Sequence, residues 1–168
     1  MIWFPRPLVL PCSPIHASAE ATLQGTREAA AAMGLQLGFL NATTIGEIDT
    51  AFASLAQERP DALFVAADAF FSTRARQFIT LAARDRIPAT YSLRDYVIAG
   101  GLMSYGADLV EIGHQVGLYT GKILKGARPA ELPVVQSTFN FALNLQTARS
   151  LGIEVPSGLL SIADEVIE

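Results

Sequence analysis

The sequence has one cysteine, few charges and no long apolar run. Cys12 is the only cysteine among 168 residues, which excludes an internal disulfide and a thiolate-rich metal site. The formal net charge is -4 and the basic residues are scattered, so no basic stripe favours a nucleic acid or an anionic membrane as partner. No window reaches about 18 uncharged apolar residues, the length needed for a transmembrane helix. These absences predict a globular domain with neither a nucleic-acid partner nor a membrane span.

Histidine is equally scarce, because His16 and His114 are the only two and neither has a partner at metal-ligand spacing. We therefore expect no metal. The glycines of the stretch GGLMSYG do not form a G-x-G-x-x-G motif that opens a helix after the first strand, so no dinucleotide cofactor is expected.

A hydrolase is also not indicated. Ser13, His16 and Asp68 are the only nucleophile, base and orienting residue that could be combined, and the sequence around Ser13 is not a nucleophile elbow. We predict a protein without catalytic residues.

The first nineteen residues, MIWFPRPLVLPCSPIHASA, end in an A-x-A-like pattern that is typical of signal-peptide cleavage sites. Four prolines and the single Arg6 argue against a signal peptide, which needs a charged start and an uninterrupted apolar run. We predict that RPLVLP is a core strand instead.

Apolar residues make up 51% of the chain and charged residues 17%, a composition that suits strands covered on both faces by helices. Strand and helix patterns alternate along one domain, residues 1–168. The predicted strands are 7–11, 35–40, 62–67 and 88–91; the predicted helices are 17–33, the segment between Thr44 and Pro60, and 70–85. This order predicts an α/β fold: a three-layer αβα sandwich with a mostly parallel sheet and a flavodoxin-like architecture.

Ligands of open parallel sheets bind where the strands end at their carboxyl edge. This rule selects the loops 12–16, 41–44, 67–72 and 91–94, together with Ser104 and Tyr105 after the Gly-Gly turn. Ser13 belongs to the first of these loops. A solute that reaches this edge would meet polar and aromatic side chains from several strands.

Asp68 stands at a predicted strand end, where its carboxylate could accept hydrogen bonds from a ligand amine. Phe70, Phe71 and Tyr91 could stack on the ligand's side chain. The alternative is that Asp68 only caps the following helix and that Phe71 is a core residue. Phe70, which is predicted to face inward less than Phe71, is the better ligand candidate.

The stretch Arg94–Gly126, RDYVIAGGLMSYGADLVEIGHQVGLYTGKILKG, and its continuation ARPAELPVVQSTFNFALNLQTARSLGIEVPSGLLSIADEVIE resemble the substrate-binding proteins of ABC transporters. The resemblance is to the branch of the type I periplasmic binding fold that includes tryptophan- and tyrosine-type binders. It extends more loosely back to about Arg6. Such proteins have two lobes that close on a solute and are usually about twice this length, so the resemblance implies that the chain is the second lobe.

This resemblance implies a function as the solute-binding component of an ABC importer. It implies a small amino-acid-like or other organic solute, an ABC permease as partner and a periplasmic or other extracytoplasmic location. The lack of a convincing signal peptide leaves a cytoplasmic location open. By resemblance the expected contacts are Asp68, Tyr91, Ser104 and Tyr105. The loop Cys12-Ser13-Pro14-Ile15-His16 departs from the N-P-x-N-P-like loop that is common in the family.

The sequence also allows two other functions. Periodicity alone is equally satisfied by a small flavodoxin-like enzyme. The same fold also serves as the cytoplasmic ligand-sensing lobe of transcription regulators.

The predicted helix 108–125 carries Gly113, Gly117 and Gly121 beside a stripe of apolar residues. In the resembling family this helix packs on the first lobe, so here its stripe is expected to be exposed and prone to association. We predict a homodimer through this helix. The alternative is that the helix folds back over its own sheet.

Overall fold

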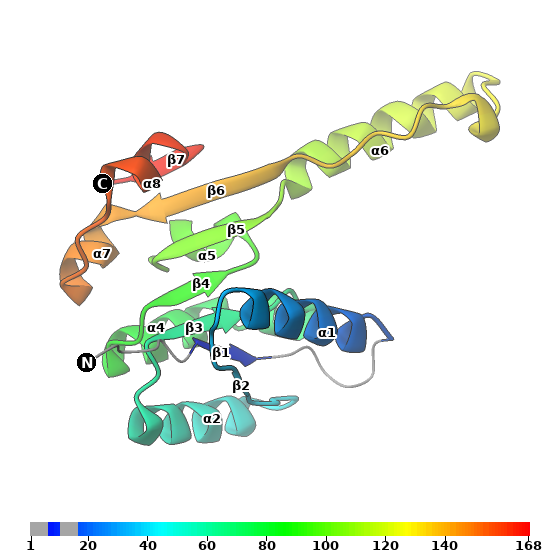
Figure 1. Ribbon diagram of the computed structural model, residues 1–168. Coiled ribbons are helices and arrows are strands. Elements are labelled where there is room, and N and C mark those ends of the chain that lie inside the picture. Colours follow the sequence, from blue (N-terminus) through cyan, green and yellow to red (C-terminus); the bar gives the residue numbers. More distant parts are fainter. Residues whose placement is uncertain (1–6, 11–16) are drawn as a thin grey trace.

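The computed structural model describes residues 7–10 and 17–168, and a seven-stranded sheet forms its centre (Figure 1). The strand order is β2-β1-β3-β4-β5-β6-β7. The bounds are β1 Pro7–Leu10, β2 Gly38–Phe39, β3 Ala62–Val65, β4 Ala89–Tyr91, β5 Met103–Ala107, β6 Phe139–Asn144 and β7 Glu165–Ile167. Strands β1 to β5 are parallel, β6 is antiparallel to β5, and β7 is parallel to β6. The predicted mostly parallel sheet is confirmed.

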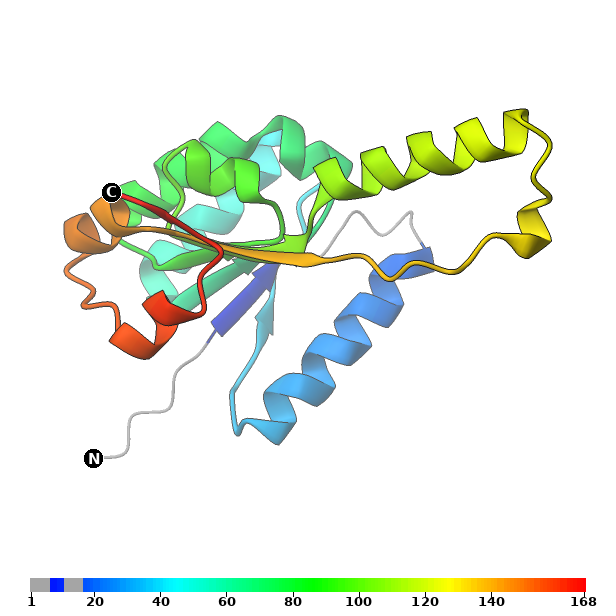
Figure 2. The same ribbon diagram turned by 90° about the horizontal axis from the view of Figure 1, so that it is seen from above.

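Helices cover both faces of this sheet. They are α1 Ala17–Ala32, α2 Ile45–Glu58, α3 Ala69–Thr73, α4 Ala75–Asp85, α5 Arg94–Ile98, α6 Leu109–Leu124, α7 Leu145–Leu151 and α8 Ser157–Ser161, with a 3₁₀ turn at Pro129–Glu131. Figure 2 shows α2, α4 and α5 on one face and α1 on the other. The predicted three-layer αβα arrangement is therefore confirmed.

The core lies between the sheet and the layer that contains α2 and α4. Phe52, Phe71 and Phe78 are fully buried there. The Phe71 and Phe78 rings pack edge to face with centroids 5.0 Å apart, and those of Phe52 and Phe78 with centroids 6.0 Å apart. Phe71 is thus a core residue, as the alternative interpretation held. This packing joins α3 and α4 to α2.

Two elements differ from the sequence-based expectation. The helix predicted over 70–85 is divided at Arg74 into α3 and α4. The hydroxyls of Ser72 and Thr73 donate to the carbonyls of Asp68 and Phe70, at 2.8 and 2.7 Å. Such back-bonding competes with the helical ladder and bends helices. The strand predicted over 35–40 is shorter, since only Gly38–Phe39 pairs with β1.

Helix α6 and the segment that returns from it form an arm, residues 109–138, that extends away from the sheet in both views (Figures 1 and 2). The side chain of Asp108 caps α6 by accepting from the amides of Val110 and Glu111. No residue of α6 is buried. The alternative in which this helix folds back over its own sheet is therefore wrong.

Candidate functional site

The carboxyl ends of the parallel strands define one edge of the sheet, here called the carboxyl edge. Val65, Tyr91 and Ala107 are the last residues of β3, β4 and β5. Because β6 is antiparallel to β5, its first residue, Phe139, also lies at this edge, opposite Ala107. The chain thus leaves the sheet for the arm and returns from it beside the predicted site.

Asp68 caps α3 at the carboxyl edge. Its Oδ1 accepts hydrogen bonds from the amides of Phe70 and Phe71, at 2.7 and 3.1 Å. The structure therefore bears out the capping role that was the alternative to ligand binding. One carboxylate oxygen accepts both bonds, so capping does not require Oδ2. A ligand contact at Asp68 stays a prediction.

Phe70 lies beside this cap and is half-buried. Its ring centroid is 6.0 Å from that of Phe71, and the guanidinium of Arg74 lies 5.9 Å from the Phe70 centroid. The Phe70 ring thus lies between a core side chain, Phe71, and a cation at the surface, Arg74. This position suits contact with a solute better than that of Phe71, which is fully buried.

Tyr91 lies in the core, where its side chain is only 1% exposed. Its ring stacks on that of Tyr96 in α5, with centroids 4.5 Å apart and an interplanar angle of 16°. Burial raises the pKa of Tyr91 well above its usual value and, as the main cause, raises the pKa of Tyr96 to about 12. The expected contact between Tyr91 and a solute does not fit this placement, because neighbouring side chains cover the ring.

Ser104 and Tyr105 point to opposite faces of the sheet, since successive residues of a strand alternate. Ser104 is 1% exposed, and its hydroxyl is buried with no hydrogen-bond partner among the described residues. Tyr105 is 61% exposed and stacks on Phe139, with centroids 5.5 Å apart. The two side chains were predicted to share a ligand, but the sheet separates them. Ser13, the remaining predicted contact, lies outside the described residues.

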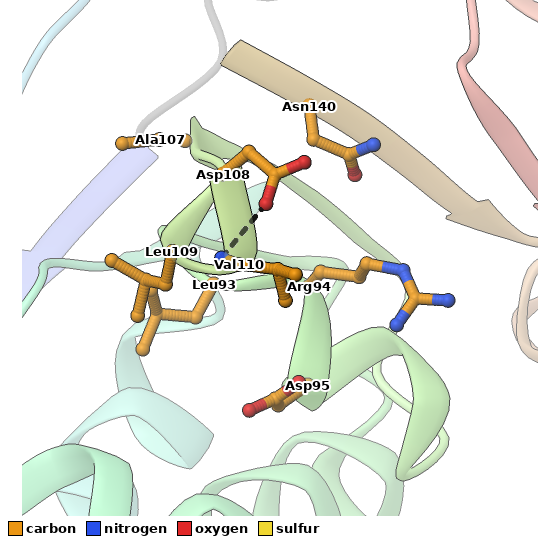
Figure 3. Close-up of a pocket in the computed structure, with 9 residues that line it drawn as sticks. Leu93, Arg94, Asp95, Ala107, Asp108, Leu109, Val110 and Asn140 are labelled. Atoms are coloured by element: carbon orange, nitrogen blue, oxygen red, sulfur yellow. Dashed lines mark hydrogen bonds between the residues drawn. The ribbon is translucent and has the colours of Figure 1, made fainter. Parts of the chain in front are cut away.

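A small hollow opens at the carboxyl edge between the starts of α5, α6 and β6 (Figure 3). Its volume is about 100 Å³. This is below the roughly 300–1,000 Å³ of most ligand pockets. The lining residues include Leu93, Arg94, Gly106, Asp108 and Asn140. The hollow alone is too small to enclose an amino acid.

The polar side chains around this hollow are those of Asn140, Asp108, Arg94 and Asp95. The Oδ1 of Asn140 is buried without a hydrogen-bond partner among the described residues. Arg94 is held by a bidentate ion pair with Glu165 of β7, in which Nη2 lies 2.7 Å from Oε1. Hydrogen bonding to Glu165 raises the pKa of the Arg94 guanidinium. Arg94 therefore fastens α5 to the edge strand.

Position 106, which also lines this hollow, must be glycine because the backbone of Ser92 approaches it closely. A Cβ at this position would lie 1.9 Å from the carbonyl oxygen of Ser92, so no other residue fits. The glycine of the stretch GGLMSYG thus lets β5 pass the loop that follows β4. The selected loop 91–94 includes Arg94, but sequence reasoning missed Asn140 and the pairing of Arg94 with Glu165, because only the register of β6 and the position of β7 bring these residues together at this edge.

Among the described residues, no group of three or more His, Cys, Asp and Glu side chains could hold a metal ion. None of the helices in the described ranges is long and apolar enough to cross a membrane.

The profile of the ABC transporter substrate-binding protein family matches residues 4–167. The chain belongs to this family. Family members bind solutes, work with an ABC permease, are typically non-catalytic and are typically extracytoplasmic. No curated protein matches the sequence.

Three solved structures show which part of such a protein this family member matches. An ABC domain from Streptococcus pneumonia, solved in complex with L-Trp, is 26% identical with a TM-score of 0.84; the match covers 97% of this chain and 56% of that one. A conserved domain protein from Vibrio cholerae is 25% identical with a TM-score of 0.83, covering 96% and 54%. A ligand-free, open substrate-binding protein from Clostridium difficile is 22% identical with a TM-score of 0.70, covering 97% and 54%. The chain spans about half the length of these proteins.

Proposed function

We propose that this chain supplies one lobe of the solute receptor of an ABC importer, and that it binds a small amino-acid-like solute without catalysis. The observation that carries the proposal is the overlap of 97% of the chain, at a TM-score of 0.84, with an ABC domain that was solved with L-Trp. An ABC permease as partner and a location outside the cytoplasm belong to the same proposal. The half-length match supports a site that a second lobe completes.

Asp68 and Phe70 are the contacts that we assign to the solute. Asp68 uses Oδ1 for both amides of the α3 cap, which leaves Oδ2 to accept a hydrogen bond from the solute's ammonium group. The half-buried ring of Phe70 would pack against an apolar or aromatic side chain. Ser13 stays in the proposed site because its loop follows β1, the neighbour of β3 in the sheet.

The hollow at Asn140 provides a control position. Strands β4 and β5 lie between β3 and β6, so about three strand spacings, or roughly 14 Å, separate Asp68 from Asn140. One amino acid does not reach both. A solute that binds at Asp68 leaves Asn140 unaffected.

Titration of isotope-labelled protein with L-Trp tests the proposal. Up to roughly 10 mM L-Trp, which reaches even weak affinities, the amide resonances of Asp68, Phe70 and Phe71 should shift. An Asn140→Ala variant should give the same shifts. Shifts confined to residues around Asn140, or no shift for L-Trp and other amino acids, would contradict the assignment.

A further inference from the structure

A basin opens between the carboxyl ends of α2 and α4, beside the amino ends of β3 and β4. These two helices lie side by side, and the amide nitrogen of Gln77 in α4 donates to the carboxylate of Asp49 in α2 at 2.9 Å. The volume of the basin is about 540 Å³, which is within the roughly 300–1,000 Å³ of most ligand pockets. Its lining residues include Ala56, Arg59, Pro60, Asp85 and Arg86.

Arg59 and Arg86 are the two residues other than glycine that have a positive φ among the described residues, at 47° and 54°. Arg59 ends α2 and Arg86 ends α4. A residue with a Cβ adopts this conformation at a cost, whereas glycine adopts it freely. Gly34 and Gly152, which follow α1 and α7, have the same sign of φ. Backbone stability alone would therefore favour glycine at both ends of the basin.

The charges of the two arginines are not neutralised within the basin. Both arginines are exposed, and neither forms an ion pair with a described residue. Asp85 is the acidic residue that lines the basin, and its two carboxylate oxygens accept hydrogen bonds from Nε and Nη2 of Arg84, each at 2.7 Å. The charge of Asp85 is thus matched by Arg84, which leaves two cations facing one cavity.

The partial negative charge of a helix end also attracts a cation. In α4, however, Arg84 already stands in the last turn, where it has an ordinary helical conformation. Attraction to the helix end therefore does not account for a second arginine, Arg86, at the end of α4. Glu58 and Asp61, the acidic residues nearest to Arg59 in the sequence, are not among the lining residues of the basin.

We propose that this basin binds the phosphate group of an organic phosphate through Arg59 and Arg86. A guanidinium donates paired hydrogen bonds to phosphate oxygens, and two guanidiniums balance the nearly two negative charges of a phosphate monoester. Ala56 and Pro60 provide apolar surface for the organic part of such a ligand. The site is separate from the proposed solute site, because Asp68 follows the carboxyl end of β3.

Titration with a soluble phosphate ester and binding to lipid vesicles distinguish two sources of this phosphate. With α-glycerophosphate up to about 20 mM, the side-chain Nε resonances of Arg59 and Arg86 should shift at constant ionic strength, and glycerol should shift neither. Phosphatidylcholine vesicles with and without phosphatidic acid test a lipid headgroup by cosedimentation. Shifts with α-glycerophosphate show that a soluble ester binds, and cosedimentation that needs phosphatidic acid without such shifts identifies a headgroup. Binding to neither probe overturns the proposal.

A glycine variant separates the ligand role of the arginines from any role in folding. Arg59→Gly with Arg86→Gly removes both cations and relieves both positive φ angles, so the variant should melt no lower than the unmodified chain. Its affinity for whichever phosphate probe binds should fall at least about tenfold. Arg76→Gln with Arg149→Gln removes two exposed cations elsewhere and should keep the affinity. An affinity that survives the glycine substitutions, or that falls equally in the control, overturns the proposal.

Discussion

At the scale of single residues, Asp68 combines a structural bond with the proposed solute contact. Asp68→Asn keeps a side-chain oxygen for the α3 cap, because Asn caps helices as well as Asp does. Loss of the negative charge should weaken a charge-assisted bond to the solute's ammonium group by about 1.5–3 kcal/mol. The melting temperature should change little, while solute affinity measured by titration falls.

Asp68→Ala is the matched control, since it removes the cap as well as the charge. It should lower the free energy of unfolding by about 1 kcal/mol in addition to weakening solute binding. If Asp68→Asn binds the solute normally and melts earlier, Asp68 is structural only.

Gly106 permits a second test at a single position. Gly106→Ala would place a Cβ 1.9 Å from the Ser92 carbonyl oxygen, so β5 or the loop after β4 must shift. We expect the free energy of unfolding to fall by about 1–3 kcal/mol or more. Gly25→Ala, in an open position of α1, should leave it unchanged or raise it by up to about 1 kcal/mol. Urea denaturation of both variants measures the difference; equal effects would contradict the close approach.

The stacked tyrosines should make the fold sensitive to alkaline pH. Burial raises the pKa of Tyr96 to about 12 in the folded state, while the unfolded chain has the ordinary value of 10.0. Tyr96 therefore holds its proton more tightly in the folded state than in the unfolded chain. The protonated hydroxyl makes its full contribution to the free energy of unfolding below pH 10, and this contribution is lost as pH rises toward 12. For Tyr96 alone the loss is about 2 kcal/mol at pH 12.

Urea denaturation between pH 9 and pH 12 measures this decline. A variant with Tyr91→Phe and Tyr96→Phe has a different free energy of unfolding at pH 9. This free energy should decline less steeply with pH than that of the unmodified chain, because neither ring ionises. An equal slope in the variant would show that other groups cause the alkaline loss.

Only some of the residues at the candidate site could be predicted from the sequence. The strand-end position of Asp68 follows from a short apolar run and a carboxylate, which local sequence reveals. Local sequence does not reveal that Tyr91 is covered by Tyr96. The opposite orientation of Ser104 and Tyr105 follows from strand alternation once β5 is known to contain both residues. Asn140 reaches the edge only because β6 pairs antiparallel with β5, a long-range register.

At the scale of the elements, periodicity and capping residues predicted α2 and α6 well. Thr44 caps α2 by accepting from the amide of Glu47, and Asp108 caps α6. The division of α3 from α4 was missed because hydroxyl back-bonds at Ser72 and Thr73 do not alter apolar spacing. The C-terminal elements α7, α8 and β7 are short, and their contacts with the rest of the sheet define them more than their own pattern does.

Asn144, the last residue of β6, links this strand to α7 and α5. Its Oδ1 accepts from the Thr147 amide at the start of α7, and its Nδ2 donates to the Val97 carbonyl of α5 at 3.3 Å. Asn144 is 4% exposed, so Asn144→Ala leaves buried groups unpaired. The free energy of unfolding should fall by about 2–3 kcal/mol, the sum of a lost cap and a lost buried bond.

Gln146→Ala, an exposed change in α7, is the control for that variant. It should alter stability by no more than about 0.5 kcal/mol. Similar chemical denaturation midpoints for the two variants would show that Asn144 does not link α5 to α7.

At the scale of the whole molecule, a single lobe should bind its solute weakly. The chain spans about half of its solved relatives, and the hollow at the carboxyl edge does not enclose a ligand. We expect calorimetry with aromatic and branched amino acids to give a dissociation constant above about 100 μM, at least about 2.7 kcal/mol weaker than a micromolar receptor. Sub-micromolar binding by the monomer would contradict a site that needs a second lobe.

The antiparallel return of β6 also affects how the chain folds. The amide of Asp108 donates to the Thr138 carbonyl at 3.0 Å, so the arm begins and ends at adjacent points of the sheet. Residues 108–138, a span of 31 residues, nevertheless form the loop that closes when β5 pairs with β6. Loop-closure entropy rises with loop length, so a four-residue turn in place of this span would lower the closure cost by about 2 kcal/mol. The arm therefore raises the entropic cost of pairing β5 with β6.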